Sequence, residues 1–117
     1  MIAKQYRFRG QNDIRRVYRQ GRVVRGPIMS IKFLPNRRQG NYRLAVVVSK
    51  KVHKSAVTRN RIRRRIYEAF RRRQDRLQAF DMVVTVFHDT AATMPPGELE
   101  AMIHAQLSQA GILTPKR

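Results

Sequence analysis

The residues of this chain best suited to chemistry lie in one basic segment, 50–73. It contains three lysines and eight arginines but a single acid, Glu68. Ammonium and guanidinium groups bind phosphates, and the planar guanidinium can do so with two hydrogen bonds. Apolar residues recur at helical spacing within the same segment, at Ile62, Ile66, Ala69 and Phe70. The pattern therefore predicts a folded helix whose outer faces meet a polyanion.

The composition of the whole chain favours nucleic acid as that polyanion. The formal net charge is +19 over 117 residues. Charge of one sign destabilises a compact state, and phosphates that screen it release condensed counterions on binding. Because 42% of the residues are hydrophobic, we expect one folded domain over 1–117, with a basic arm at 1–10 and a disordered tail at 112–117.

The sequence also predicts where the protein works. The longest apolar run, 82–87, has the length of a strand and is far too short to cross a membrane. The absence of cysteine excludes disulfides and leaves the redox compartment open. The first residues carry no apolar region typical of a signal peptide. We therefore expect a cytoplasmic protein with no membrane partner.

Residues for protein-based catalysis are not arranged in any recognisable pattern. The seven acids are Asp13, Glu68, Asp75, Asp81, Asp89, Glu98 and Glu100, and their spacing does not suit a two-metal site. The histidines His53, His88 and His104 are far apart. No Ser-His-Asp arrangement or phosphate-binding glycine loop is readable. The sequence therefore predicts no catalytic residue and no metal site in the protein itself.

Two polar residues have alternative interpretations. Asn60 stands between two arginines in the predicted helix, where asparagine is unusual. It is either an exposed filler or an amide directed at a phosphate, a base edge or a metal-bound water. Tyr18 lies among arginines and is either a stacking platform for single-stranded bases or a core residue. Core packing is the interpretation for Phe33, Phe70, Phe80 and Phe87.

Hydrophobic periodicity and turn residues predict the elements that position these side chains. We expect a helix capped by Asn12 or Asp13 and ending at Gly21, strands at 23–24, 28–34 and 42–49, a basic helix over 56–73 capped by Ser55, a central strand over 82–87, and a helix from Pro96 to Gly111. Residues 35–41 predict a hairpin loop. The result is an α+β fold of order α-β-β-β-α-β-α, a small mixed sheet packed with helices. The basic helix could cross between parallel strands.

Residues 50–71 also carry a specific pattern of residue types. It reads Lys50-Lys51-x-x-x-x-Ala56-Val57-x-Arg59-Asn60-Arg61-Ile62-x-Arg64-x-x-x-Glu68-x-Phe70-Arg71. This pattern resembles the signature of the protein subunit of bacterial ribonuclease P. The resemblance covers residues 10–110, since the early helix ending at Gly21 and the strand led by Asp81 also agree.

The resemblance implies a fold similar to ribosomal protein S5 domain 2, with a left-handed crossover holding the Arg-Asn-Arg motif. It implies an endoribonuclease holoenzyme that removes the 5′ leader of precursor tRNA by phosphodiester hydrolysis. A catalytic RNA with bound Mg²⁺ performs the chemistry, and the protein contacts this RNA and the precursor. Within the holoenzyme the protein is expected to be monomeric.

The resemblance also assigns residues to two surfaces. Those expected to face the catalytic RNA are Lys50, Lys51, Lys54, Arg59, Asn60, Arg61, Arg63, Arg64 and Arg65. A cleft between the first helix and the sheet would hold the leader, with Ile14, Arg15, Tyr18 and Lys32. Family members often carry an aromatic residue at the position of Ile14 and another on the cleft strand near Lys32. A phosphate contact is expected from Lys32 instead.

Composition alone leaves two alternatives open. A structural ribosomal RNA-binding protein fits the size, the charge and the mixed α/β pattern equally well. A DNA-binding or chromatin-type protein also fits the charge. The Arg59-Asn60-Arg61 signature separates the ribonuclease P subunit from both.

Overall fold

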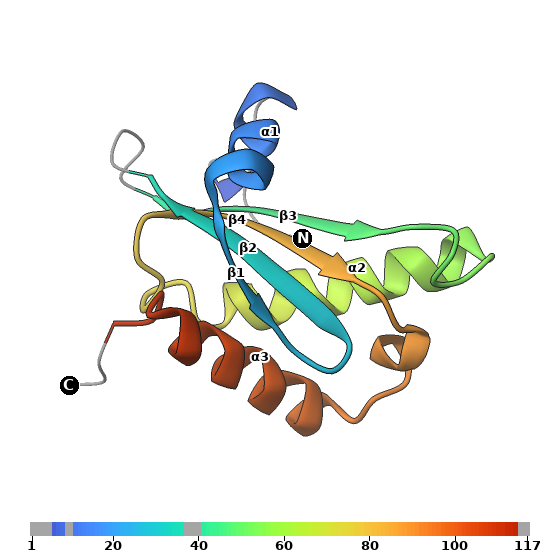
Figure 1. The fold of residues 1–117 in the computed structure, drawn as a ribbon. Coiled ribbons are helices and arrows are strands. Elements are labelled where there is room, and N and C mark those ends of the chain that lie inside the picture. The colour runs from blue at the N-terminus through green and yellow to red at the C-terminus, as the bar shows by residue number, and fades with distance from the viewer. Residues whose placement is uncertain (1–5, 9–10, 37–40, 115–117) are drawn as a thin grey trace.

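A four-stranded mixed sheet forms the centre of the computed structural model, which describes residues 6–8, 11–36 and 41–114 (Figure 1). The strands are β1 (Arg22–Arg25), β2 (Met29–Pro35), β3 (Arg43–Val48) and β4 (Phe80–Val86). Their order in the sheet is β1-β2-β4-β3. β2 is antiparallel to both β1 and β4, whereas β3 and β4 run parallel.

Three α-helices and one short 3₁₀ helix complete the described part of the fold. They are α1 (Gln11–Gln20), α2 (Ala56–Arg71), η2 (Asp89–Ala92) and α3 (Pro96–Ala110). α2 connects the parallel strands β3 and β4 and lies behind the sheet in Figure 1, which makes a left-handed crossover. The predicted α+β class, the element order and the parallel crossover are confirmed.

The core lies between the sheet and the helices α2 and α3. Alternate residues of β2 are buried, namely Met29, Ile31 and Phe33, as the period-two pattern predicts. Ile62 and Ile66 of α2 pack in the same cluster. α1 instead lies on the other face of the sheet, so that this face is only partly covered.

One predicted connection is wrong. Strands β2 and β3 do not form a hairpin, because β4 lies between them and pairs with both. β4 is buried on both faces along most of its length, and burying both faces favours a central position. The observed hairpin joins β1 and β2 instead. Residues 37–40 of the predicted loop lie outside the described residues.

Most of the predicted helix ends agree with the structure, and Pro96 begins α3 as predicted. The basic helix α2 ends at Arg71, two residues before the predicted end at Arg73. Ser55 caps α2, since its side chain accepts a hydrogen bond from the Thr58 N–H. Gly21 follows α1 directly, and Gly111 ends α3 with φ 76°, a conformation that favours glycine. The predicted cap at Asn12 or Asp13 is wrong, because α1 already includes both residues.

Both ends of the described chain pack against the fold. The Tyr6 ring stacks on Tyr42, with ring centroids 4.4 Å apart. At the other end, Ile112 is buried and Leu113 bridges to Leu77. Residues 112 and 113 of the predicted tail are therefore packed on the fold, and 115–117 lie outside the described residues.

None of the helices in the described part of the chain is both long enough and apolar enough to cross a membrane.

Candidate nucleic-acid interface

The loop before α2 and the first turn of this helix carry four of the predicted RNA-binding cations. Lys50, Lys51 and Lys54 are exposed, and the first turn of α2 holds no acid to oppose them. Arg59 donates from Nη1 to the carbonyl oxygens of His53 (2.9 Å) and Lys54 (2.8 Å). Arg59 therefore connects the loop that carries the lysines to the helix. Its guanidinium group lies beside that loop.

Two further arginines of the motif hold α2 against η2. Arg61 donates from Nε to the Ala92 carbonyl at 3.0 Å. Arg65 donates to the carbonyls of Ala91, at 2.5 Å, and Met94. Burial lowers the pKa of Arg65, and the positive charge of Arg61 acts in the same direction. These two guanidinium groups complete main-chain hydrogen bonding that η2 cannot satisfy itself.

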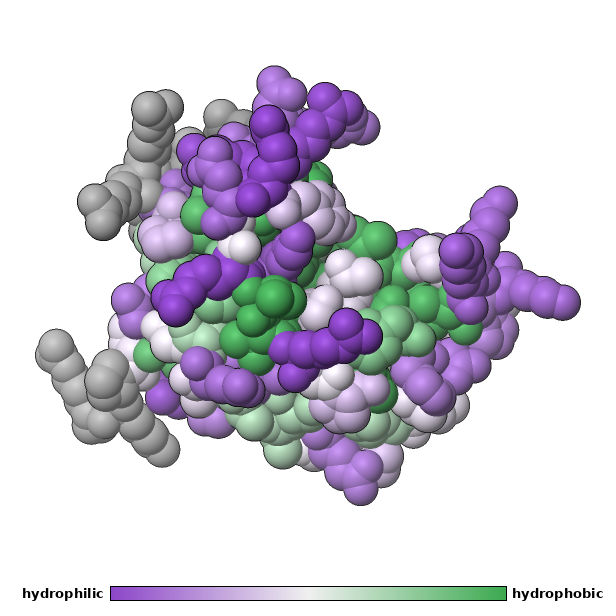
Figure 2. All heavy atoms as spheres, viewed as in Figure 1, coloured by the Kyte–Doolittle hydropathy of each residue, from purple (hydrophilic) through white to green (hydrophobic). Residues whose placement is uncertain are grey.

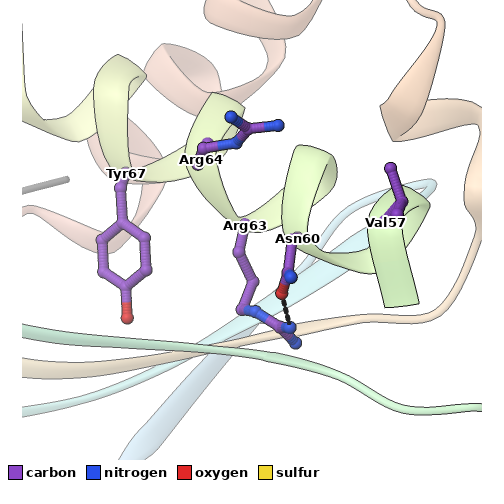
Figure 3. A pocket seen from close by; sticks show the side chains of 5 residues that line it. All are labelled: Val57, Asn60, Arg63, Arg64 and Tyr67. Carbon is purple, nitrogen blue, oxygen red and sulfur yellow. Dashed lines mark hydrogen bonds between the residues drawn. The ribbon is translucent and has the colours of Figure 1, made fainter.

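The opposite side of the motif presents its polar groups to solvent. Asn60 is exposed, and its Oδ1 accepts a hydrogen bond from Arg63, drawn as a dashed line in Figure 3. Arg64 is exposed and has no protein partner among the described residues. With Val57 and Tyr67, these residues line a pocket of about 530 Å³ on the surface of α2. Asn60 is therefore neither buried nor an isolated filler: it positions Arg63.

All nine residues assigned to the catalytic RNA therefore lie in the loop before α2 or on this helix between Arg59 and Arg65. They divide into two groups that residue type did not distinguish. Arg59, Arg61 and Arg65 bond to main-chain carbonyls. The remaining six make no such bond and keep their polar groups at the surface: Lys50, Lys51, Lys54, Asn60, Arg63 and Arg64. Further along the helix, Glu68 pairs with Arg71 and Arg72, and not with Arg64.

The residues assigned to the leader cleft gather at α1 and β2. Tyr18 is 41% exposed, which excludes the core interpretation. Lys32 donates from Nζ to the Tyr18 carbonyl at 2.8 Å, and the same nitrogen lies 5.3 Å from the Tyr18 ring centroid. Ile14 is half-buried on the same helix. Arg15 is exposed and donates to Gln11 within α1.

A buried charge cluster holds α1 on the sheet. Asp81 of β4 and Arg43 of β3 are buried and form a bidentate pair, with both nitrogen–oxygen distances 2.8 Å. Arg43 also donates to Asp13 of α1 at 2.9 Å, and Asn36 donates to Asp81 at 2.7 Å. The hydrogen bond to Asp81 raises the pKa of Arg43. The sequence predicts Asp13 only as a helix cap, and the cluster was missed because its members are distant in sequence.

Phe87 and Arg25 are further surface residues that the sequence did not single out. Phe87 was predicted in the core but is 39% exposed, so that prediction is wrong. The Arg25 guanidinium carbon lies 5.0 Å from its ring centroid. The available signal was strand alternation, because Phe87 has the opposite parity to the core residues Met82, Val84 and Val86.

Among the described residues, no three histidine, cysteine, aspartate or glutamate side chains gather in a way that could hold a metal ion. Asp81 has its carboxylate oxygens engaged by Arg43 and Asn36. The described surfaces offer exposed cations and aromatic rings, and these groups are suited to binding nucleic acid.

Comparison with known proteins agrees with this arrangement. The family model described as Ribonuclease P matches residues 2–111. A "Ribonuclease P protein component" from Pseudanabaena sp. is 40% identical over 96 residues, which are 81% of each chain. A protein of the same name from Chloroflexus aurantiacus is 39% identical over 113 residues, covering 96% of this chain and 82% of that one.

Solved structures show the same fold. A mutant RNase P protein from Staphylococcus aureus superposes with a TM-score of 0.85 at 28% identity, covering 94% of this chain and 92% of that one. The RNase P protein from Thermotoga maritima has a TM-score of 0.77 over 88% of this chain at 22% identity, which supports the fold alone. With the family model matching nearly the whole chain, this protein belongs to the ribonuclease P protein family.

Proposed function

We propose that this protein is the subunit of ribonuclease P that binds the catalytic RNA and the 5′ leader of precursor tRNA. The holoenzyme would remove that leader by phosphodiester hydrolysis. The observation that carries the proposal is the group of exposed cations on α2 and its preceding loop, in a chain of this family. Family membership favours this function over a structural ribosomal protein or a DNA-binding protein.

The α2 surface is suited to the catalytic RNA. Lys50, Lys51, Lys54 and Arg64 are exposed, and no acid of the first helical turn competes with phosphate for them. Arg63 is held by Asn60, so that its guanidinium is already positioned before RNA arrives. Contacts of this kind make affinity strongly dependent on salt, because each neutralised phosphate releases counterions.

The face formed by α1 and the sheet is suited to a single strand. Tyr18 offers a ring for stacking a base, and Lys32 lies beside it with a positive charge. An aromatic ring with a nearby cation is typical of sites for unpaired nucleotides. Lys32 also bonds to the Tyr18 carbonyl, so it positions this part of α1 while remaining available to a phosphate.

We assign the chemistry and the Mg²⁺ ions to the RNA partner. The described carboxylates do not gather into a metal site, whereas RNA phosphates are suitable oxygen ligands for Mg²⁺. In this account the protein lowers the repulsion between the catalytic RNA and its substrate. One protein molecule would act in each holoenzyme, in the cytoplasm.

Reconstitution at low Mg²⁺ tests this function. The protein is added to a folded bacterial ribonuclease P RNA, and 5′ maturation of a precursor tRNA is followed. We expect cleavage at a Mg²⁺ concentration where the RNA alone is inactive, because protein cations replace part of the screening by metal. The control is the RNA alone at high Mg²⁺, which shows that the RNA is folded and competent. Activity there without rescue at low Mg²⁺ contradicts the proposal.

A further inference from the structure

A second aromatic ring is exposed on the same side of the sheet as Tyr18. Phe87 follows β4 directly, and alternation along the strand places it opposite the core residues Val84 and Val86. Phe87 buries part of its surface but keeps 39% of it exposed. The exposed part of this large apolar ring can therefore take an occupant.

The sheet register defines the surface around it. Arg25, Ser30, Thr85 and Val47 occupy one row across all four strands, and Val23, Lys32, Val83 and Ala45 occupy the next. α1 covers this face where Val17 and Val83 are buried. Val23 is 56% exposed and Val47 is 38% exposed. The face is thus open beyond α1, and Figure 2 shows apolar surface below that helix with hydrophilic side chains around and across it.

The same combination of ring and cation occurs twice on this face. Lys32 lies 5.3 Å from the Tyr18 ring centroid, and the Arg25 guanidinium carbon lies 5.0 Å from that of Phe87. Phe87 is four residues beyond Val83, the partner of Lys32, which is about 13 Å along the strand. A single strand of RNA that contacts the first pair can therefore continue to the second.

The electrostatic surroundings select nucleic acid over an apolar partner. Arg25 and Lys32 lie on the same face of the sheet as the exposed Val23, and the chain carries a net charge of +19. An exposed pair of arginine and phenylalanine contributes only about 0.5–1 kcal/mol to stability. Stability alone thus accounts poorly for the part of the ring that is exposed, whereas a stacked base would cover it.

We propose that Phe87 and Arg25 form a second stacking site for the leader, separate from the one at Tyr18. Phe87 stacks a nucleobase, and Arg25 neutralises a neighbouring phosphate. This inference rests on the proposed function, because it assumes that the leader lies on this face. It adds a residue that recognises the leader at the end of β4. It also predicts that the leader's contribution to binding affinity depends on the length of the leader.

The test uses the reconstituted holoenzyme and precursor tRNAs whose leaders are shortened one nucleotide at a time. The affinity of the wild type and of Phe87→Ala is measured for each. For long leaders we expect Phe87→Ala to weaken binding about fivefold or more, the lower range for loss of one stacked base. For short leaders and for mature tRNA the two proteins should bind equally. The effect of Tyr18→Ala should disappear at a different leader length.

Two matched variants separate stacking from packing. Phe87→Tyr keeps the ring and should retain the affinity of the wild type, whereas Phe87→Leu keeps apolar bulk and should behave as Phe87→Ala. A fluorescent base analogue placed along the leader should be quenched at one position in the wild type and recover in Phe87→Leu. Thermal unfolding of each variant verifies that it is folded.

The outcomes distinguish this inference from the proposed function. If the wild-type holoenzyme does not prefer leader-bearing tRNA, the proposed function fails. If it does, and Tyr18→Ala reduces that preference while Phe87→Ala and Phe87→Leu match the wild type at every leader length, only the second stacking site is overturned. Equal loss by Phe87→Ala for long-leader and mature tRNA overturns it as well.

Discussion

Charge has opposite uses in two regions of this protein. Beneath α1, Arg43 and Asp81 are buried, pair through two hydrogen bonds and connect to Asp13. On α2, Arg64 and the lysines of the preceding loop are exposed and face no acid of the first turn. The first region satisfies its charges within the fold, and the second leaves them for a partner.

The comparison extends into α2 itself. Arg61 and Arg65 lie one turn apart and bond to carbonyls of residues 91–94, whereas Arg64, the neighbour of Arg65, has no protein partner among the described residues. Adjacent arginines in a basic run thus bond to the fold or leave their charge at the surface, according to their helical phase. The number of arginines in the segment is therefore larger than the number of guanidinium groups that are available to contact RNA.

The largest effect is expected in the buried cluster. Arg43→Met leaves the Asp81 carboxylate buried without its partner, and we expect the free energy of unfolding to fall by about 3–5 kcal/mol. Denaturant titration measures this loss. The double variant Arg43→Met/Asp81→Leu removes both charges and should recover much of it. A single variant as stable as the wild type would show that the cluster does not hold the fold.

A smaller effect is expected where α2 meets η2. Arg65→Ala leaves the carbonyls of Ala91 and Met94 without their donor, and we expect a loss of about 2 kcal/mol in unfolding free energy, as for hydrogen bonds to charged groups. Arg64→Ala is the matched control, with a change within about 0.5 kcal/mol, as for a surface substitution. Equal losses of unfolding free energy in the two variants would contradict the different structural roles of Arg64 and Arg65.

Arg64→Ala should instead act on RNA. We expect weaker binding to the catalytic RNA and a salt dependence whose slope falls by about one, since one phosphate contact is lost. Filter binding over a series of salt concentrations measures both quantities. Unchanged affinity and slope would mean that the exposed side of α2 does not face the RNA.

The smallest effect is expected at Asn60. Asn60→Ala removes the acceptor that holds Arg63 but no charge, so RNA affinity should fall by about 0.5–1 kcal/mol, the net value of one hydrogen bond, with an unchanged salt slope. Arg63→Ala provides the comparison, since it should reduce the slope. A reduced slope for Asn60→Ala would argue that the amide does more than position Arg63.

Local features of the fold were predictable from sequence. The alternation of Met29, Ile31 and Phe33 predicted the buried face of β2, and Ser55 predicted the start of α2, because these signals depend on neighbouring residues. The position of β4 between β2 and β3 was not predicted. It depends on which strands pair across long segments of chain, and the apolar run of β4 only indicated a central place.

The candidate site was predictable in location but not in its division of roles. The residue pattern placed the basic face on α2, yet Arg61, Arg64 and Arg65 are equivalent by type. Their roles depend on whether they contact η2. This helix is separated from α2 in the sequence by β4, so the contact is not visible from neighbouring residues. Phe87 was assigned to the core from its spacing in the sequence, whereas its alternation with Val84 and Val86 places it on the open face of the sheet.

The most direct test of the two-surface account is the ratio of holoenzyme affinities for precursor and mature tRNA. It is measured for the wild type, Tyr18→Ala and Arg64→Ala, each fully assembled with the catalytic RNA. We predict that Tyr18→Ala moves the ratio towards one, since leader stacking is lost, and that Arg64→Ala keeps the wild-type ratio once assembly is saturated. A ratio unchanged in Tyr18→Ala, or lowered equally in both variants, would contradict the separation of the two surfaces.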